Sequence, residues 1–341
     1  MMHRIIYSLF FIVISVLITA CATLDKKQLA RSSLVWPSPP ASARIVFDQA
    51  FSTPEELGIG KGFWQWLGDI VFGADEDHMV RPMAVLAVGD QIFVADPGAR
   101  GVHRFDTGSQ SYQLIQAKDE MILPSPVALA ADKDGNVYVS DSKLAQLLQI
   151  RKGADYAQLV TLDTALQQPT GIAIEPDSGQ LYVVDTQQHQ VLVFSSQGQL
   201  MRRFGQRGEQ PGEFNYPTLI WQQNGTLLVT DALNFRIQLF DLQGKYLADF
   251  GKIGQSSGYQ SRPKGVAMDR EGHIYVVDAL FHTVQLFDRD GQFLMNIGDQ
   301  GQQPGQFWLP AGIYITPQQD IYVADSQNQR VQVFRYVGGQ P

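Results

Sequence analysis

Six aspartates recur at nearly constant spacing along the chain of 341 residues, each at the end of a short apolar run. The runs IFVAD, VYVSD, LYVVD, LLVTD, IYVVD and IYVAD end at Asp96, Asp141, Asp185, Asp231, Asp278 and Asp325. A ring of carboxylates could bind a cation, because oxygen ligands suit hard metal ions. An Asp that follows a strand can instead accept hydrogen bonds from backbone N–H groups of the next loop. We interpret the six carboxylates as structural.

Histidine and cysteine side chains offer little further chemistry. Of the six histidines, only His189 and His282 stand at the same distance from their repeated Asp, and their two repeats are not neighbours. A zinc site needs three or four close ligands, and the chain has a single cysteine, Cys21. Nothing resembles a Ser, His and Asp order or a nucleophile elbow. We therefore predict no catalytic residue, no metal ligand and no cofactor.

The repeated aspartates belong to units of 44 to 47 residues. Each unit also has an apolar run led by proline, such as PTGIAI, and another after the Asp, such as VQVF. Two of the intervening turns, residues 132–136 and 222–226, contain Asp-Gly and Asn-Gly, which accept positive φ at little cost. Four antiparallel strands repeated six times predict an all-β fold, a six-bladed β-propeller.

The last unit ends early, so its fourth strand must come from elsewhere. Residues 43–51, ARIVFDQAF, have a strand pattern and precede the first unit. We predict that this N-terminal strand pairs with residues 331–336 and completes the last blade, because propellers must protect their sheet edges. The alternative is that residues 43–51 form only an extra edge strand.

The N-terminus carries a targeting signal. An apolar stretch at residues 5–18 follows a basic start and precedes Cys21, the one cysteine. The sequence Ile-Thr-Ala-Cys at 18–21 resembles the lipobox of bacterial lipoproteins, which implies a diacylglyceryl group on the Cys21 thiol, cleavage before Cys21 and acylation of the new amine. The residue after Cys21 is Ala rather than Asp, which in this resemblance favours the outer membrane. The alternative is an uncleaved anchor helix.

These features divide the chain into three parts. We assign residues 1–20 to the signal peptide, 21–42 to the lipidated cysteine and a flexible, Pro-rich tether, and 43–341 to the propeller. A stretch near 60–78 fits no blade and is predicted to form a short helical insert with an apolar face. This insert either caps the propeller or docks on a membrane or partner.

Loops that follow each repeated Asp and loops that precede each proline lie on one face of a propeller, here called the top face. Arg81, Arg262 and Lys264 flank the prolines of two units and could form a basic mouth that attracts an anionic ligand. They could equally be separate solvated charges. The remaining candidate ligand-binding residues in these loops are Tyr216, His189, Phe235, Phe281 and His282.

The loops RFGQRGEQPGEFNYP (203–217), DFGKIGQSSGYQSRP (249–263) and NIGDQGQQPGQFWLP (296–310) resemble NHL repeats. The resemblance extends over about residues 80–336 and is strongest in the last four units. It implies a six-bladed propeller of the NHL type, similar to bacterial propeller lipoproteins, for which it implies no common activity.

We therefore expect a lipid-anchored binding or scaffold protein of the bacterial outer membrane. Its top face would recognise an envelope protein, a peptide or a glycan. The formal net charge of −8 disfavours a nucleic-acid partner. The alternative is a metal-dependent hydrolase or lyase with its site in the central channel, and a structural subunit of a homo-oligomer is a third possibility.

Overall fold

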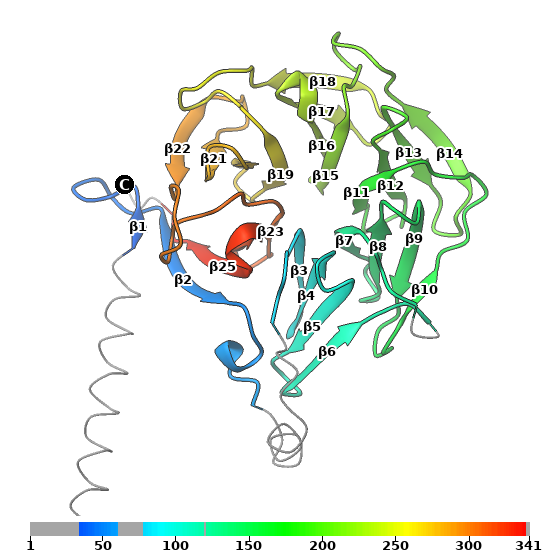
Figure 1. The fold of residues 1–341 in the computed structure, drawn as a ribbon. Helices are drawn as coiled ribbons and strands as arrows, with labels where there is room; N and C mark the ends of the chain where they lie inside the picture. Colours follow the sequence, from blue (N-terminus) through cyan, green and yellow to red (C-terminus); the bar gives the residue numbers. More distant parts are fainter. Residues whose placement is uncertain (1–33, 61–77, 119–120, 339–341) are drawn as a thin grey trace, which may run out of the picture.

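The computed structural model describes residues 34–60, 78–118 and 121–338. Six antiparallel sheets surround a central axis, as Figure 1 shows, so the predicted six-bladed β-propeller is confirmed. The signal peptide, Cys21 and nearly all of the predicted insert lie outside the described residues. No helix within the described ranges has the length and apolar character to cross a membrane.

The innermost strand of each blade lies nearest the axis, and in four blades it begins at the repeated proline. These strands are β3 (Ala84–Val88), β7 (Pro126–Ala131), β11 (Pro169–Ile174), β15 (Pro217–Gln223), β19 (Pro263–Met268) and β23 (Ile313–Ile315). The second strand of each blade ends at the repeated Asp. These are β4 (Gln91–Asp96), β8 (Val137–Asp141), β12 (Leu181–Asp185), β16 (Thr226–Asp231), β20 (Ile274–Asp278) and β24 (Asp320–Asp325).

The third strands follow the top-face loops, two of which contain the 3-10 turns η3 (Ala232–Asn234) and η4 (Ser326–Asn328). They are β5 (Gly101–Asp106), β9 (Gln146–Ile150), β13 (Gln190–Phe194), β17 (Arg236–Asp241), β21 (Thr283–Phe287) and β25 (Arg330–Tyr336). The fourth strands form the rim: β6 (Ser111–Ile115), β10 (Ala157–Leu159), β14 (Leu200–Phe204), β18 (Tyr246–Phe250), β22 (Phe293–Ile297) and, in the last blade, β2 (Ile45–Phe51).

The N-terminal strand closes the ring as predicted. β2 pairs with β25 in antiparallel register, with Ile45 opposite Tyr336 and Phe51 opposite Val331. The sheet order β1-β2-β25-β24-β23 joins both ends of the domain in one blade. This pairing covers the edge of β25, which would otherwise be open because the last unit ends early.

The end of the predicted tether belongs to the fold, which corrects the assignment of residues 21–42. β1 (Val35–Trp36) pairs with β2, with Trp36 opposite Ile45. The Trp36 ring lies 5.5 Å from the ring of Phe334 in an edge-on contact. The Pro-rich surroundings suggested a tether, whereas the packing of one aromatic ring holds this segment on the last blade. A further 3-10 turn, η1 (Glu55–Leu57), follows β2.

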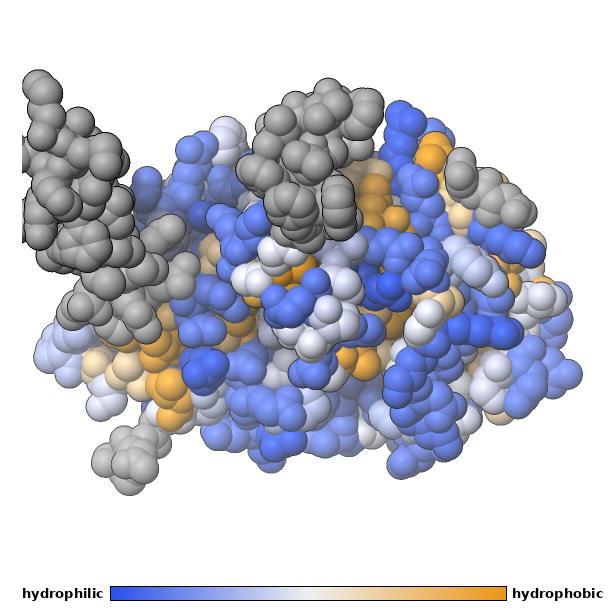
Figure 2. Space-filling model, turned by 90° about the horizontal axis from the view of Figure 1, so that it is seen from below, coloured by the Kyte–Doolittle hydropathy of each residue, from blue (hydrophilic) through white to orange (hydrophobic). Residues whose placement is uncertain are grey.

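The hydrophobic core lies between the blades. Side chains alternate along each strand, so both faces of a blade meet a neighbouring blade. Tyr275 and Val277 of β20, for example, pack with Ile313, Val323 and Phe334 of the last blade. The rim that carries β2 and β6 is mostly hydrophilic, with small separate hydrophobic groups, as Figure 2 shows.

Glycines let the inner strands of neighbouring blades approach closely. A Cβ at Gly171 in β11 would lie 2.7 Å from backbone atoms of Leu219 and Ile220 in β15. A Cβ at Gly312, beside β23, would lie 2.5 Å from the carbonyl oxygen of Met83. Heavy atoms cannot approach so closely, so larger residues here would force the blades apart.

One loop carries a polar residue where its counterparts carry phenylalanine. Gln260, Phe214 and Phe307 occupy equivalent bridge positions in three successive connections between blades, and all three are completely buried. Neither amide atom of Gln260 has a hydrogen-bond partner. A buried polar group without a partner costs about 1–3 kcal/mol.

Replacing Gln260 by phenylalanine should therefore stabilise the protein. We expect Gln260→Phe to raise the free energy of unfolding by about 1–3 kcal/mol, because the unpaired amide is removed and an apolar ring fills the site. Urea denaturation followed by circular dichroism measures this change. The exposed substitution Gln243→Phe serves as the control and should change little. A lower stability of Gln260→Phe would contradict the proposed equivalence of the three sites.

Candidate functional site

The repeated aspartates hold the two sets of top-face loops together. The carboxylate of Asp96 accepts N–H groups of Val80 and Arg81 before the inner strand, at 2.7 and 3.0 Å. It also accepts N–H groups of Gly98 and Ala99 in the loop after its own strand, at 2.7 and 3.0 Å. Burial acts to raise the pKa of Asp96, but the hydrogen bond with His103 and these backbone N–H groups together lower it below its usual value. The carboxylate therefore has the structural role expected from the sequence.

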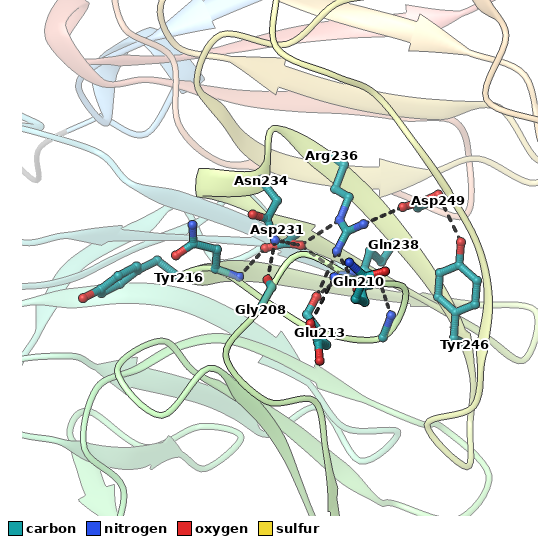
Figure 3. A network of polar contacts seen from close by, with 12 residues as sticks. Gly208, Gln210, Glu213, Tyr216, Asp231, Asn234, Arg236, Gln238, Tyr246 and Asp249 are labelled. Carbon is teal, nitrogen blue, oxygen red and sulfur yellow. Dashed lines mark hydrogen bonds and ion pairs between the residues drawn. The ribbon is translucent and has the colours of Figure 1, made fainter.

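In the fourth blade, side chains also donate hydrogen bonds to the repeated aspartate, as Figure 3 shows. Asp231 accepts hydrogen bonds from Asn234, Arg236 and Gln238, at 2.8, 2.9 and 3.0 Å. Arg236 also contacts Asp249 at 2.8 Å and donates to the carbonyl of Gln210. Burial raises the pKa of Asp231, and the hydrogen bonds oppose this rise. The network fixes the loop that crosses the top face.

The last blade repeats this network and the fifth does not. Asp325 accepts from Asn328, Arg330 and Gln332 at 2.8, 2.8 and 3.0 Å. In the fifth blade, Phe281 and Thr283 stand where the other two blades have Asn and Arg. The pattern Asn-x-Arg-x-Gln in the sequence thus indicates the hydrogen-bond network that holds the loop. It does not indicate a ligand site.

No set of three or more His, Cys, Asp or Glu side chains converges within the described residues in a way that could hold a metal ion. His103 lies 3.4 Å from Asp96, but the Asp96 oxygens already accept backbone N–H groups. Each of the other five repeated aspartates likewise accepts a backbone N–H group of the loop before the inner strand.

Both candidate histidines contact the neighbouring blade. His189 Nδ1 accepts the backbone N–H of Tyr216 at 3.1 Å, and its ring meets the Tyr216 ring edge-on at 4.6 Å. His282 Nδ1 accepts the N–H of Leu309 at the same distance. Each histidine has positive φ at the last position of its loop. Their shared position thus reflects a contact between blades.

The two candidate phenylalanines are only partly exposed. Phe235 and Phe281 are half-buried in their top-face loops. Phe235 has a φ of 56°, in the left-handed region, whereas the N–H of Phe281 donates to Asp278.

The cationic candidates are only partly brought together. Arg81 and Arg262 are exposed, and Lys264, the second residue of β19, is half-buried. Burial lowers the pKa of Lys264, and Arg262 nearby lowers it further. Lys264 has no ion pair within the part of the chain that the structure describes. Among the described residues no contact joins Arg81 to the other two, whereas Arg262 lies near enough to Lys264 to affect its pKa.

The structure reveals an apolar surface that sequence reasoning missed. Eight of the fourteen large apolar side chains exposed within the described ranges lie in top-face loops: Val80, Met121, Ile122, Tyr216, Leu233, Ile253, Leu280 and Trp308. We call these eight residues the top apolar patch. Leu233 and Leu280 both stand two residues after a repeated Asp, which was the available signal in the sequence. Their exposure, 51% and 49%, could only be known from the fold.

Comparison with known families agrees with this architecture. A family model described as a 6-bladed beta-propeller matches residues 130–249, and an NHL repeat model matches residues 307–334. The peptidyl-glycine alpha-amidating monooxygenase of Mus musculus is 28% identical over 119 residues. The peptidyl-glycine alpha-amidating monooxygenase A of Xenopus laevis is 30% identical over 121 residues. Each match covers 31% of this chain but only 12% and 13% of the relatives, so the chain spans about an eighth of their length.

Solved structures with similar architecture include enzymes and binding proteins. Virginiamycin B lyase from Staphylococcus aureus has a TM-score of 0.56 at 14% identity, covering 76% of this chain and 96% of the lyase. An auxiliary nutrient binding protein from Bacteroides thetaiotaomicron has a TM-score of 0.60 at 11% identity, covering 77% and 71%. Identities this low establish the fold alone. The chain is a six-bladed β-propeller, and its residues 307–334 match the NHL repeat model.

Proposed function

We propose that this protein is a lipid-anchored binding or scaffold protein of the bacterial outer membrane, and that its top face recognises an envelope protein, peptide or glycan. One observation carries the proposal: the exposed large apolar side chains concentrate on the top face. Large apolar side chains that are exposed mainly on one face can mark an interaction site. The apolar stretch before Cys21 supports the lipid anchor.

The opposite face has a different character. It consists of the turns that leave the inner strands, such as residues 132–136 and 222–226, and of the turns between third and fourth strands. Among these turns and the residues that follow β25, within the described part of the chain, Tyr156 and Val337 are the exposed large apolar side chains. The two faces therefore differ in their capacity to bury apolar surface of a partner, which supports the top face as the proposed recognition surface.

Aromatic side chains suit both peptide and glycan partners. Trp308 and Tyr216 are 42% and 41% exposed. Such side chains provide large contact area at low cost in conformational entropy, and they are enriched among residues that dominate binding energy. Arg262 and Lys264 add positive charge to the same face. A partner with apolar groups and a nearby anionic group would match this surface.

Affinity capture from solubilised envelope tests the proposal. We expect the double variant Leu233→Asp with Leu280→Asp to lose most of the material that the full-length wild type captures, because charge disfavours burial of these positions. The matched control is Met201→Asp with Leu247→Asp, since these rim residues are similarly exposed, at 53% and 51%. Equal capture by both double variants would contradict a top-face site.

Lys264 should behave as a residue that lowers stability and promotes binding. Its lowered pKa means that the folded state binds a proton less tightly than the unfolded state. The resulting penalty is fully present below the folded pKa and falls as the pH rises through it. Lys264→Met should therefore raise the free energy of unfolding by about 1 kcal/mol at neutral pH, with a smaller gain at alkaline pH.

The same variant should weaken capture of the envelope partner, because the ammonium is no longer available to an anionic group. Urea denaturation across a pH series and quantitative capture measure the two effects. A variant that is less stable than the wild type at neutral pH would show that the ammonium has a stabilising partner.

A further inference from the structure

The centre of the propeller contains a cavity of about 460 Å³. Its wall is built from the inner strands of all six blades, from Ala84 in β3 to Ile315 in β23. The lining also reaches Gln223, Arg270 and Pro317, which stand where the inner strands turn back. Arg270 and Pro317 are exposed. The cavity therefore opens on the face opposite to the top apolar patch, so it is a separate site.

The wall of the cavity is largely apolar. Leu129, Ile174, Leu219, Trp221 and Tyr314 line it and are only half-buried although they lie near the molecular axis. Their remaining exposed area faces the cavity, because the blades cover their other sides. A volume of this size falls within the range of small-molecule sites, which are mostly apolar with few polar groups.

Two aromatic side chains give the wall its specific chemistry. The rings of Trp221 and Tyr314, from β15 and β23, meet edge-on with centroids 5.6 Å apart. The Tyr314 hydroxyl makes no hydrogen bond with any described residue. Burial raises the pKa of Tyr314, so the hydroxyl stays neutral and keeps its proton for donation.

Neither charged residue of the lining offers a free charge to a ligand deep inside the cavity. Asp269 is the acidic residue of the lining, and its carboxylate already accepts from the N–H groups of Glu271 and His273, both at 2.9 Å, and from the Tyr275 hydroxyl at 3.1 Å. Arg270 is the basic residue, and it lies at the exposed mouth. An ion inside the cavity would lose its hydration without gaining a partner.

We propose that this cavity binds a small neutral aromatic molecule that carries a carbonyl group. The aromatic part packs against Trp221 and the aliphatic wall, and the Tyr314 hydroxyl donates a hydrogen bond to the carbonyl oxygen. This site is independent of the proposed top-face function, because the cavity opens on the face opposite to the top apolar patch.

Equilibrium dialysis of the full-length protein with two probes tests this site. Coumarin is a neutral aromatic lactone with a carbonyl, and naphthalene has a similar shape without an acceptor. We expect the wild type to bind both. Ala131→Trp, which places a large ring at the lining of the cavity, should weaken both by at least tenfold. Ala248→Trp, on the exposed rim strand β18, should change neither affinity.

Tyr314→Phe keeps the aromatic ring and removes the hydroxyl, so it separates the contribution of packing from that of the hydrogen bond. It should weaken coumarin about 2- to 10-fold, the worth of one hydrogen bond, and leave naphthalene unchanged. Leu280→Asp on the top face should bind both probes like the wild type, whatever the fate of the envelope partner. Absence of probe binding to the wild type would overturn the site. Equal weakening of both probes by Tyr314→Phe would overturn the role of its hydroxyl.

Discussion

A chain that lacks residues 1–51 is expected not to fold as a monomer, because it lacks β1 and the strand that completes the last blade. Ile45, Phe47 and Phe51 of β2 are almost completely buried. The Phe47 ring meets Phe334 of the last blade at 5.6 Å, and the Phe51 ring meets Phe105 of the first blade at 5.5 Å. β2 thus joins the two ends of the ring.

The size of this effect follows from the area that β2 buries. Each of the three side chains contributes about 1.5–3 kcal/mol, and a domain is stable by only about 5–15 kcal/mol in total. The deletion also exposes the hydrogen-bonding edge of β25, which favours aggregation. Far-UV circular dichroism and size-exclusion chromatography measure the outcome.

A shorter deletion is the matched control. Removal of residues 1–33 keeps both β1 and β2. This variant should be a folded monomer whose midpoint of unfolding equals that of the full-length chain. If the chain without residues 1–51 also folded with that midpoint, the closure of the ring by β2 would be wrong.

Asp325→Ala is expected to lower the free energy of unfolding by about 3–5 kcal/mol, the cost of breaking a buried ion pair from one side. The carboxylate accepts the N–H of Trp308 at 2.8 Å in addition to its bonds with Asn328, Arg330 and Gln332. Its removal takes a buried, charged acceptor away from a mostly buried guanidinium and from two amide groups. The loop of residues 299–309 would lose the hydrogen bond from Trp308, one of its attachments to the blade.

Urea denaturation of Asp325→Ala beside Asp288→Ala tests this prediction. Asp288 also accepts two backbone N–H groups, from Asp290 and Gln292, but it lies in a solvent-exposed turn on the opposite face. Its removal should cost about 1 kcal/mol or less, because water replaces the lost acceptor. Equal losses in the two variants would show that burial of the network contributes nothing.

The ring and its closure could be predicted from the sequence because both depend on local patterns. The interval between repeated aspartates, from Asp96 to Asp325, fixed the number of blades, and the missing strand of the last unit pointed to residues 43–51. β1 could not be predicted in the same way. It contains two residues within a Pro-rich segment, and only the contact of Trp36 with Phe334 reveals that the segment belongs to the last blade.

The properties of the site were harder to foresee because they depend on neighbours that are distant in sequence. His189 and His282 share a loop position, yet the Nδ1 atom of each accepts a hydrogen bond from a backbone N–H group that leads into the following blade. Leu233 and Leu280 could have been core residues, and only the assembled blades leave them exposed. The burial of Lys264 likewise arises where the inner strands converge.

Site-specific photo-crosslinking in intact cells tests the top face as the recognition surface most directly. A benzophenone amino acid replaces Leu233 or Leu280 on the top face, and Leu247 or Met201 on the rim, where side-chain exposure is nearly the same. We predict that ultraviolet light yields one discrete adduct from both top-face positions and none from the rim positions. Adducts from the rim positions with none from the top face would contradict recognition through the loops that the six aspartates hold together.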